Sequence, residues 1–226
     1  MRDQGYIDGR QCSKADPRAM RVSGGTLKLT AMKDPDRTDK CTFGGKKYSY
    51  RLTGHVGTVG PKVGNAAQHP TKTFKYGYFA ARMKMQSLRG QHAGFWLQSP
   101  LNAGPARTHG SEVDIVEYFG DKHPQGGVAS YIYPPGKKVG GMISKPTRFG
   151  RDWSKKFHVF SVQWTPSAYI FRIDGHETLR ITRDVSRVAE YMVLSNLVSD
   201  WELSLMKNEN KLPQTAQVDW VRHWKL

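Results

Sequence analysis

Apolar and polar side chains alternate with a period of two residues in segment after segment of this chain. The stretch 78–85 would place Phe79, Ala81, Met83 and Met85 on one face and more polar neighbours on the other. Comparable stretches are 26–30, 157–164, 169–173 and 218–224. Such alternation is typical of strands with one buried face, and no segment shows the long apolar period of a helix bundle. We therefore predict an all-β fold, a β-jelly-roll sandwich of two antiparallel sheets.

The sequence contains no internal repeat and no linker that would divide its 226 residues. β-Sandwiches of this length often form a single unit, so we expect one domain over residues 1–226. The stretches 99–110 and 133–150 contain several Gly and Pro residues and are expected to be long loops, which often carry function.

The chain is strongly basic. Its 35 Lys and Arg against 19 Asp and Glu give a formal net charge of +16, which attracts anions at long range. The basic residues are scattered and come with no nucleic-acid-binding signature, so we expect no nucleic-acid partner. An acidic polymer is one possible partner. The alternative is that the basic surface serves solubility alone and has no dedicated anionic partner. No apolar run is long enough for a membrane span.

Two cysteines, Cys12 and Cys41, form no metal-binding pattern. A disulfide between them would close an N-terminal loop and fits an exported protein, although two buried thiols are the alternative. The first residues lack the apolar stretch of a signal peptide. We expect a secreted or cell-surface protein whose signal peptide is absent from this chain.

An acidic cluster lies within a stretch that otherwise favours a strand. Residues 111–119 are rich in Val, Ile, Tyr and Phe, yet they include Glu112, Asp114 and Glu117. Simple alternation would turn Glu117 away from the other two, and a one-residue β-bulge at 115–116 would bring it back. Three carboxylates facing a core would be costly, so we expect an open groove. A solvated edge strand is the structural alternative.

Paired carboxylates are the chemistry that cleaves glycosidic bonds. One carboxylate acts as nucleophile and a second, protonated carboxyl acts as acid, about 5–5.5 Å away in retaining enzymes. Asp114, between the two glutamates, can hold the nucleophile by sharing a proton. Its negative charge also raises the proton affinity of Glu117. This pattern predicts glycoside hydrolysis at Glu112 and Glu117.

Several further motifs occur in a fixed order along the chain. Besides the Glu-x-Asp-x-x-Glu pattern, they are the segments 25–29, 76–84, 94–97, 157–165, 174–175, 196–197 and 218–222. With these motifs, residues 24 to 224 resemble glycoside hydrolase family 16, the laminarinase-like jelly-roll enzymes.

The resemblance implies the fold, the reaction and the roles of the acids. It implies a jelly roll with a substrate cleft on its concave face, in which Glu112 is the nucleophile, Asp114 the assisting carboxylate and Glu117 the general acid and base. The implied activity is that of a retaining endo-β-glycanase, with β-1,3-glucan as the first expected substrate and a galactan or anionic polysaccharide as the alternative. We expect a monomeric catalytic domain whose partner is the polysaccharide.

Three residues are implied to bind the substrate. Arg82 and Trp96 would line the sugar sites, and Trp201 would contact the sugar chain. For Trp201 the local sequence supports the same role without the resemblance, because an aromatic ring in the polar stretch 199–202 is a natural platform for a sugar ring. Packing in the core or against the sandwich is the alternative for both tryptophans.

Other cleft positions depart from the family pattern. His92 stands where many β-1,3-glucanases have a tryptophan, and Tyr133 stands near a histidine that often bonds the assisting aspartate. Gln163 and Ala80 stand where the family often has glutamate. We expect His92, Tyr133 and Gln163 to contribute to substrate binding. Together with the positive charge, the lost acids suggest a polymer that carries negative groups.

No cofactor is required by this chemistry. Some members of the family bind a structural calcium ion partly through an aspartate in the final strand, and Asp219 occupies that place here. Part of the remaining calcium site belongs to an N-terminal segment of the family that this sequence lacks.

The sequence is also compatible with functions other than glycoside hydrolysis. Jelly rolls also serve as lectins and carbohydrate-binding modules, which do not need two glutamates flanking an aspartate. A polysaccharide lyase would need a base and an acid, for which Tyr131 or Tyr133 with His92 are candidates. A transglycosylase would use the same trio but exclude water from the glycosyl-enzyme.

Overall fold

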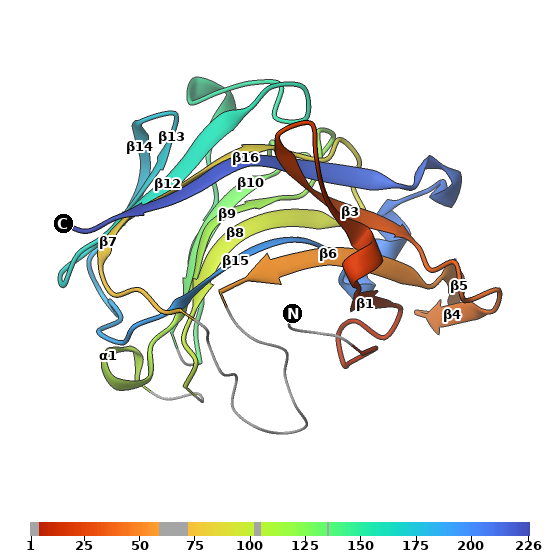
Figure 1. Cartoon of the computed structure of the whole chain (residues 1–226), viewed down its shortest axis with the longest axis horizontal. Coiled ribbons are helices and arrows are strands. Elements are labelled where there is room, and N and C mark those ends of the chain that lie inside the picture. The colour runs from red at the N-terminus through yellow and green to blue at the C-terminus, as the bar shows by residue number, and fades with distance from the viewer. Residues whose placement is uncertain (1–4, 59–71, 102–104, 135) are drawn as a thin grey trace.

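A computed structural model describes residues 5–58, 72–101, 105–134 and 136–226. Two curved layers of strands lie face to face (Figure 1). One path of hydrogen-bonded strands folds over on itself through β6 (Arg51–Gly57), which pairs with β15 of one layer and β3 of the other. The fold prediction is confirmed: the chain is an all-β jelly-roll sandwich.

The inner, concave layer contains the strand that bears the acidic cluster. Its order is β11 (Val139–Met142), β10 (Val128–Tyr133), β9 (Glu112–Tyr118), β8 (His92–Gln98), β15 (Tyr191–Leu197) and β6. All of these pairs are antiparallel. β9 is therefore flanked on both sides by long strands and is not an edge strand.

The outer layer continues from β6. Its order is β3 (Thr26–Lys33), β16 (Gln214–Trp224), β7 (Gly77–Lys84), β12 (His158–Trp164), β13 (Tyr169–Ile173) and β14 (His176–Ile181). The additional strands are β2 (Met20–Ser23) on β3, β1 (Ser13–Ala15) parallel to β6, and the hairpin of β4 (Lys40–Phe43) and β5 (Lys46–Ser49).

Helices are short and lie in the connections. They are α1 (Ala106–His109), η1 (Pro17–Ala19), η2 (Pro146–Arg148), η3 (Asp200–Leu205) and η4 (Glu209–Lys211). α1 lies within the stretch 99–110, and β11 and η2 lie within 133–150. The described residues of both stretches therefore include short elements where long loops were expected from the composition, because Gly and Pro mark turns without excluding short elements between them.

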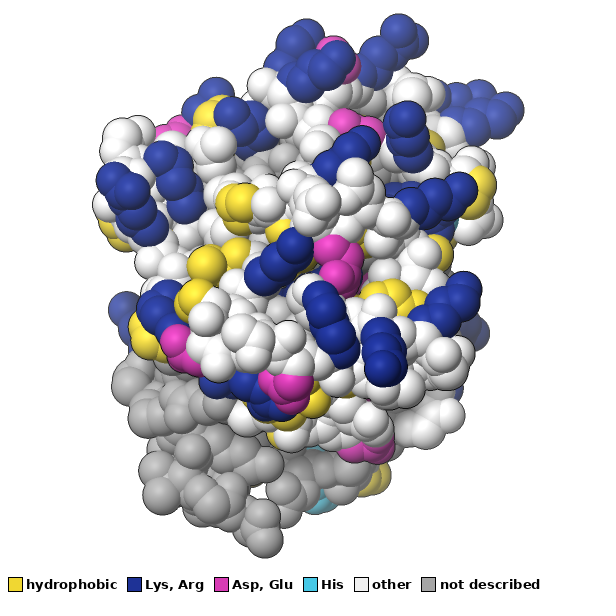
Figure 2. Space-filling model, turned by 90° about the vertical axis from the view of Figure 1, so that its right-hand side faces the viewer, with side chains coloured by type: hydrophobic (Ala, Val, Ile, Leu, Met, Phe, Trp, Pro, Cys, Tyr) yellow, Lys and Arg dark blue, Asp and Glu magenta, His cyan; other side chains and the backbone are white. Residues whose placement is uncertain are grey.

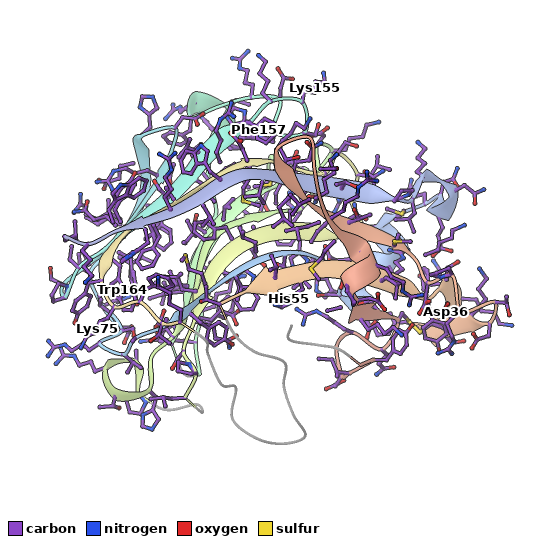
Figure 3. All side chains as sticks on the ribbon, in the orientation of Figure 1. Asp36, His55, Lys75, Lys155, Phe157 and Trp164 are labelled. Carbon is purple, nitrogen blue, oxygen red and sulfur yellow. A yellow bond between two sulfur atoms is a disulfide. The ribbon has the colours of Figure 1, made fainter. Side chains whose placement is uncertain are left out.

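The hydrophobic core lies between the two layers. The alternation over 78–85 is confirmed, since Phe79, Ala81, Met83 and Met85 are all buried in the main cluster. Trp164 of β12 is fully buried there as well (Figure 3). Burying one large apolar side chain contributes about 1.5–3 kcal/mol, so this shared core holds the two sheets at a fixed separation.

The N-terminal segment is anchored beside the concave layer. Cys12 and Cys41 form a disulfide, so the alternative of two free thiols does not hold. The buried Asp200 of η3 accepts hydrogen bonds from the backbone nitrogens of Gln11 and Cys12, at 2.8 and 3.1 Å. The backbone nitrogen of Asp200 donates to the carbonyl oxygen of Gly9 at 2.9 Å, so the backbone on both sides of Arg10 is fixed relative to η3.

The positive charge is spread over the surface. Figure 2 shows Lys and Arg side chains scattered over one face, with few acidic groups between them and no single continuous stripe. Within the described residues, no helix is long and apolar enough to cross a membrane.

Candidate active site

The acidic strand β9 contains the β-bulge that its sequence predicts. Against β8, Trp96 pairs with Asp114 and Phe95 pairs with Val116, which leaves Ile115 as the extra residue. The pairing of β9 with β10 shifts its register at the same place. The bulge therefore lies at 115–116, as predicted from the sequence.

The bulge places all three carboxylates on one face of the sheet. The side chains of Val113, Ile115, Val116 and Tyr118 belong to the main core between the layers. Two successive residues, Ile115 and Val116, face this core because of the extra residue. Alternation on both sides of the bulge then directs Glu112, Asp114 and Glu117 to the concave face.

A cavity of about 450 Å³ opens on the concave face beside Glu117. Its walls come from β8, β9 and the segment after it, β10 and the segment after it, β11, the start of η3 and the N-terminal segment. The lining residues are Arg10, His92, Glu117, Phe119, His123, Tyr131, Tyr133, Lys138, Met142, Ser199 and Trp201. Five residues singled out from the sequence thus meet in one place: His92, Glu117, Tyr131, Tyr133 and Trp201.

A buried histidine connects Glu117 to a second glutamate. His92 donates from Nδ1 to Oε2 of Glu202 at 2.6 Å, and its Nε2 lies 3.7 Å from Oε1 of Glu117. Both His92 and Glu202 are buried. Glu202 also accepts a hydrogen bond from the backbone nitrogen of Ser199 within the capping box of η3, which fixes its position.

The charges of Glu117 and His92 affect each other's pKa. Burial is the largest influence on Glu117 and raises the pKa of its carboxyl, while His92, Lys138 and Arg10 pull that pKa down and Glu202 pushes it up. The pKa of His92 is raised: burial lowers it, but the carboxylates of Glu202 and Glu117 together outweigh burial. A carboxyl with a raised pKa suits a proton donor at neutral pH.

Two tyrosines of β10 face the carboxylates. Tyr133 pairs in register with Glu112 and Tyr131 pairs with Asp114. Burial and the carboxylates raise the pKa of Tyr131 to about 12. Burial also raises the pKa of Tyr133, which responds to all three acids of β9. Both tyrosines line the cavity together with Glu117.

Two tryptophans occupy different environments. The Trp201 side chain is 55% exposed, and its ring lies 6.0 Å from that of Phe119 at the cavity wall. Trp96 is beside Asp114 in the sheet, but it is buried and donates to Oγ of Ser195 at 3.0 Å. Of the two, Trp201 presents the accessible ring.

Arg82 and Gln163 lie on the outer sheet and not beside the carboxylates. Arg82 of β7 alternates with core residues and therefore points outward, where its Nη1 lies 2.5 Å from Oδ2 of Asp219. Gln163 of β12 also points outward and accepts a hydrogen bond from Arg172. This placement corrects the expectation that they line the sugar sites. Sequence alternation fixes the face of a strand but not the sheet to which the strand belongs.

A calcium ion does not fit the surroundings of Asp219. The carboxylate of Asp219 is paired with the Arg82 guanidinium, and a cation at that distance opposes a second cation. No cluster of three or more His, Cys, Asp or Glu side chains suited to a metal occurs in the described ranges.

Several residues of the site were not singled out from the sequence. Arg10, Phe119, His123 and Lys138 line the cavity, and Glu202 lies behind it. Lys138 lies over the ring of Tyr131, 3.8 Å from its centroid. The burial of Glu202 became apparent only in the structure, where its carboxylate is paired with His92.

A jelly roll with two glutamates around an aspartate on its concave face has the architecture of a glycoside hydrolase. The chain belongs to the Glycosyl hydrolases family 16, whose family model matches residues 14–222. It is 24% identical over 169 residues to a xylanase/beta-glucanase of Ruminococcus flavefaciens, a match that covers 73% of this chain and 20% of that protein. The chain therefore spans about a fifth of the length of this relative.

Solved structures of similar fold include two laminarinases. The laminarinase catalytic domain from Thermotoga maritima has a TM-score of 0.70 and 19% identity, with 95% of this chain and 83% of that chain covered. The laminarinase from Rhodothermus marinus has a TM-score of 0.74 and 17% identity, with 99% and 88% covered. These identities are low, so the two matches establish the shared fold.

Proposed function

We propose that this glycoside hydrolase is a retaining endo-β-glycanase that cleaves internal bonds of a polysaccharide by double displacement. The observation that supports it most is the bulge in β9, which directs Glu112, Asp114 and Glu117 to one face. The proposed substrate is a β-1,3-linked glucan, because the similar solved structures include proteins named laminarinases.

In the first step, Glu112 attacks the anomeric carbon while Glu117 donates its proton to the departing sugar oxygen. The product is a glycosyl ester on Glu112 and a free chain end. In the second step, Glu117 takes a proton from water, and the resulting hydroxide displaces Glu112 from the anomeric carbon. Asp114 lies between the two and holds Glu112 in position.

The surroundings of Glu117 support its role as acid and base. Burial favours the protonated carboxyl that the first step requires. The cationic groups near it, His92, Lys138 and Arg10, favour the carboxylate that the second step requires. Trp201, exposed at the cavity wall, is proposed to stack against a sugar ring of the bound chain.

An anionic polysaccharide is the second candidate substrate. Arg10 and Lys138 lie in the cavity beside Glu117, and no other acid lines that cavity among the described residues. Positive side chains of this kind would hold sulfate or carboxylate groups on the sugar. The lyase alternative is disfavoured, because a tyrosine whose pKa is raised to about 12, such as Tyr131, is almost entirely protonated at neutral pH and therefore cannot take up a proton as a base.

Activity on a panel of glycans tests the proposal. Neutral β-glucans, a galactan and sulfated or uronate-containing polymers are incubated with the protein, and the products are identified by mass spectrometry. We expect internal cleavage with unmodified reducing ends. Unsaturated uronate products would instead assign a lyase, and binding without cleavage of any polymer would assign a lectin-like domain.

A nucleophile variant tests the covalent step. Glu112→Ala should be inactive in water, and added azide should restore cleavage of an activated aryl β-glycoside to give a glycosyl azide of inverted configuration. Glu117→Ala is the matched control, for which azide should give the azide of retained configuration. Identical products from both variants would contradict the assigned roles.

A further inference from the structure

A second cavity lies apart from the three carboxylates. Its volume is about 920 Å³, about twice the 450 Å³ of the cavity at Glu117. It is formed by α1, the segment after β10, the β12–β13 turn and the segment after β14. The lining residues are Pro105, Ala106, Arg107, Pro134, Lys137, Pro166, Ser167, Thr182, Arg183, Asp184, Val185 and Arg187.

The charge of this cavity is strongly positive. Four cations line it, and the single acid among the described lining residues, Asp184, is paired with Lys137 at 2.7 Å. The remaining three cations are Arg107, Arg183 and Arg187. None of them forms an ion pair or hydrogen bond within the described ranges. Four positive charges and one negative charge give a net of +3 in one concave site.

Three guanidinium groups around one cavity are suited to planar or tetrahedral oxyanions. Arginine presents fixed pairs of N–H donors that match carboxylate and sulfate oxygens, and it stays charged at any working pH. Gathering like charges in a cavity is unfavourable without an anion. A ligand with repeated negative groups would use all three.

Three prolines restrict the backbone of the cavity walls. Prolines 105, 134 and 166 come from three different segments, and each has a fixed φ angle. Ala106 and Val185, which also line the cavity, are buried. A restricted backbone lowers the conformational entropy that ligand binding costs.

The cavity adjoins the active site through one loop. Lys137 lines this second cavity, and the next residue, Lys138, lines the cavity at Glu117. Pro134 directly follows Tyr133, which pairs with Glu112 in the sheet. A polymer bound at the carboxylates can therefore reach the second cavity past the segment 136–138.

We propose that this arginine cavity binds the acidic groups of a polysaccharide, sulfate esters or uronate carboxylates, and so holds an anionic glycan beside the active site. This inference rests on the proposed function only in taking a polysaccharide as the ligand. The proposed binding site is separate from the cleft, and in it the positive charges of the three arginines bind the ligand.

Binding of a matched pair of polymers tests the inference. The probes are a soluble β-1,3-glucan and its chemically sulfated derivative, and binding is measured by calorimetry at 150 mM salt in the Glu112→Gln background to prevent turnover. We expect the sulfated polymer to bind at least tenfold more tightly than the neutral one. The triple variant Arg107→Gln, Arg183→Gln, Arg187→Gln should weaken binding of the sulfated polymer at least tenfold and leave the neutral polymer unchanged.

A charge-matched variant separates the cavity from long-range attraction. Lys46→Gln, Lys47→Gln, Lys155→Gln removes three exposed charges that lie on the β5 hairpin and on the outer side, away from α1 (Figures 1 and 3). Both triple variants lower the formal net charge from +16 by three, to +13. The control should change Kd less than twofold. Equal weakening by both triple variants overturns the proposal.

Two further outcomes are decisive. Single-stranded DNA that binds more tightly than the sulfated glucan, with the same dependence on the three arginines, would assign a nucleic-acid site and overturn the proposal. Cavity-dependent binding of the sulfated polymer in a protein that cleaves no glycan would refute the proposed hydrolase activity but support this binding site.

Discussion

Replacing His92 should shift the pH dependence of catalysis, because His92 is the cationic group that lowers the pKa of Glu117 most. The distance from His92 Nε2 to Glu117 Oε1 is 3.7 Å, and both side chains are largely removed from solvent. Two opposite unit charges at that distance attract by about 4 kcal/mol at an effective dielectric constant of about 20. Glu202, bonded to the other ring nitrogen, offsets part of this attraction.

The pKa of Glu117 should rise when His92 is replaced, because His92 stabilises the ionised carboxylate. A protonated His92 favours the ionised form of Glu117 and so lowers its pKa below what burial alone would give. In His92→Gln this cation is lost while Glu202 remains, so the pKa of Glu117 should rise. The first step requires protonated Glu117, so the basic limb of kcat/KM should move to higher pH. We expect a shift of at least one pH unit, which corresponds to about 1.4 kcal/mol.

The assay is the pH profile of kcat/KM on the best glucan of the panel, measured for the parent and for His92→Gln. The acidic limb, which reports the nucleophile, should stay in place. His123→Gln is a matched control, because His123 lines the same cavity but its pKa is lowered by burial and by Arg89, which keeps it neutral. A basic limb that stays in place in His92→Gln, or moves to lower pH, would refute the reasoning.

Four further outcomes are expected. Glu112→Gln should lower kcat at least about 10⁴-fold, the order seen when a nucleophile is removed, with an unchanged circular dichroism spectrum. Glu117→Gln should lower kcat about 10²–10⁴-fold on polysaccharide but far less on aryl glycosides with good leaving groups, and equal losses on both would contradict its role as acid. Trp201→Ala should raise KM about fivefold to tenfold with little change in kcat, since one stacked ring contributes about 1 kcal/mol; a change confined to kcat would argue against stacking. Replacing both Cys12 and Cys41 by Ser should destabilise the protein by about 3.6 kcal/mol for the 29-residue separation, or about 7–14 °C in Tm, measured by calorimetry.

The acidic strand could be predicted from the sequence in unusual detail. Glu112, Asp114 and Glu117 break strict alternation by one residue, and a bulge at 115–116 is the local conformation that returns Glu117 to the face of the other two. The structure has this bulge. The prediction worked because strand formers surround the acids and limit the local conformations available.

Some contacts of the cleft wall could not be predicted from local sequence patterns. His92 and Glu202 meet across 110 positions of sequence, and Arg10 reaches the cavity only because Asp200 and the Cys12 disulfide dock the N-terminal segment. Contacts of this kind depend on how distant segments pack, which no local pattern encodes. The prediction that Arg82 lines the sugar sites was wrong for a related reason. Alternation predicts that Arg82 points away from the core, but it does not show that β7 belongs to the outer sheet.

The stereochemistry of cleavage tests the central claim most directly. Proton NMR of a β-glucan digest, recorded within the first minutes, distinguishes the anomer released by the enzyme from the one formed later by mutarotation. If Glu112 forms a covalent intermediate on the face opposite to the proton supplied by Glu117, the β-anomer appears first. First appearance of the α-anomer would mean a single displacement by water and would contradict the mechanism proposed for these two glutamates.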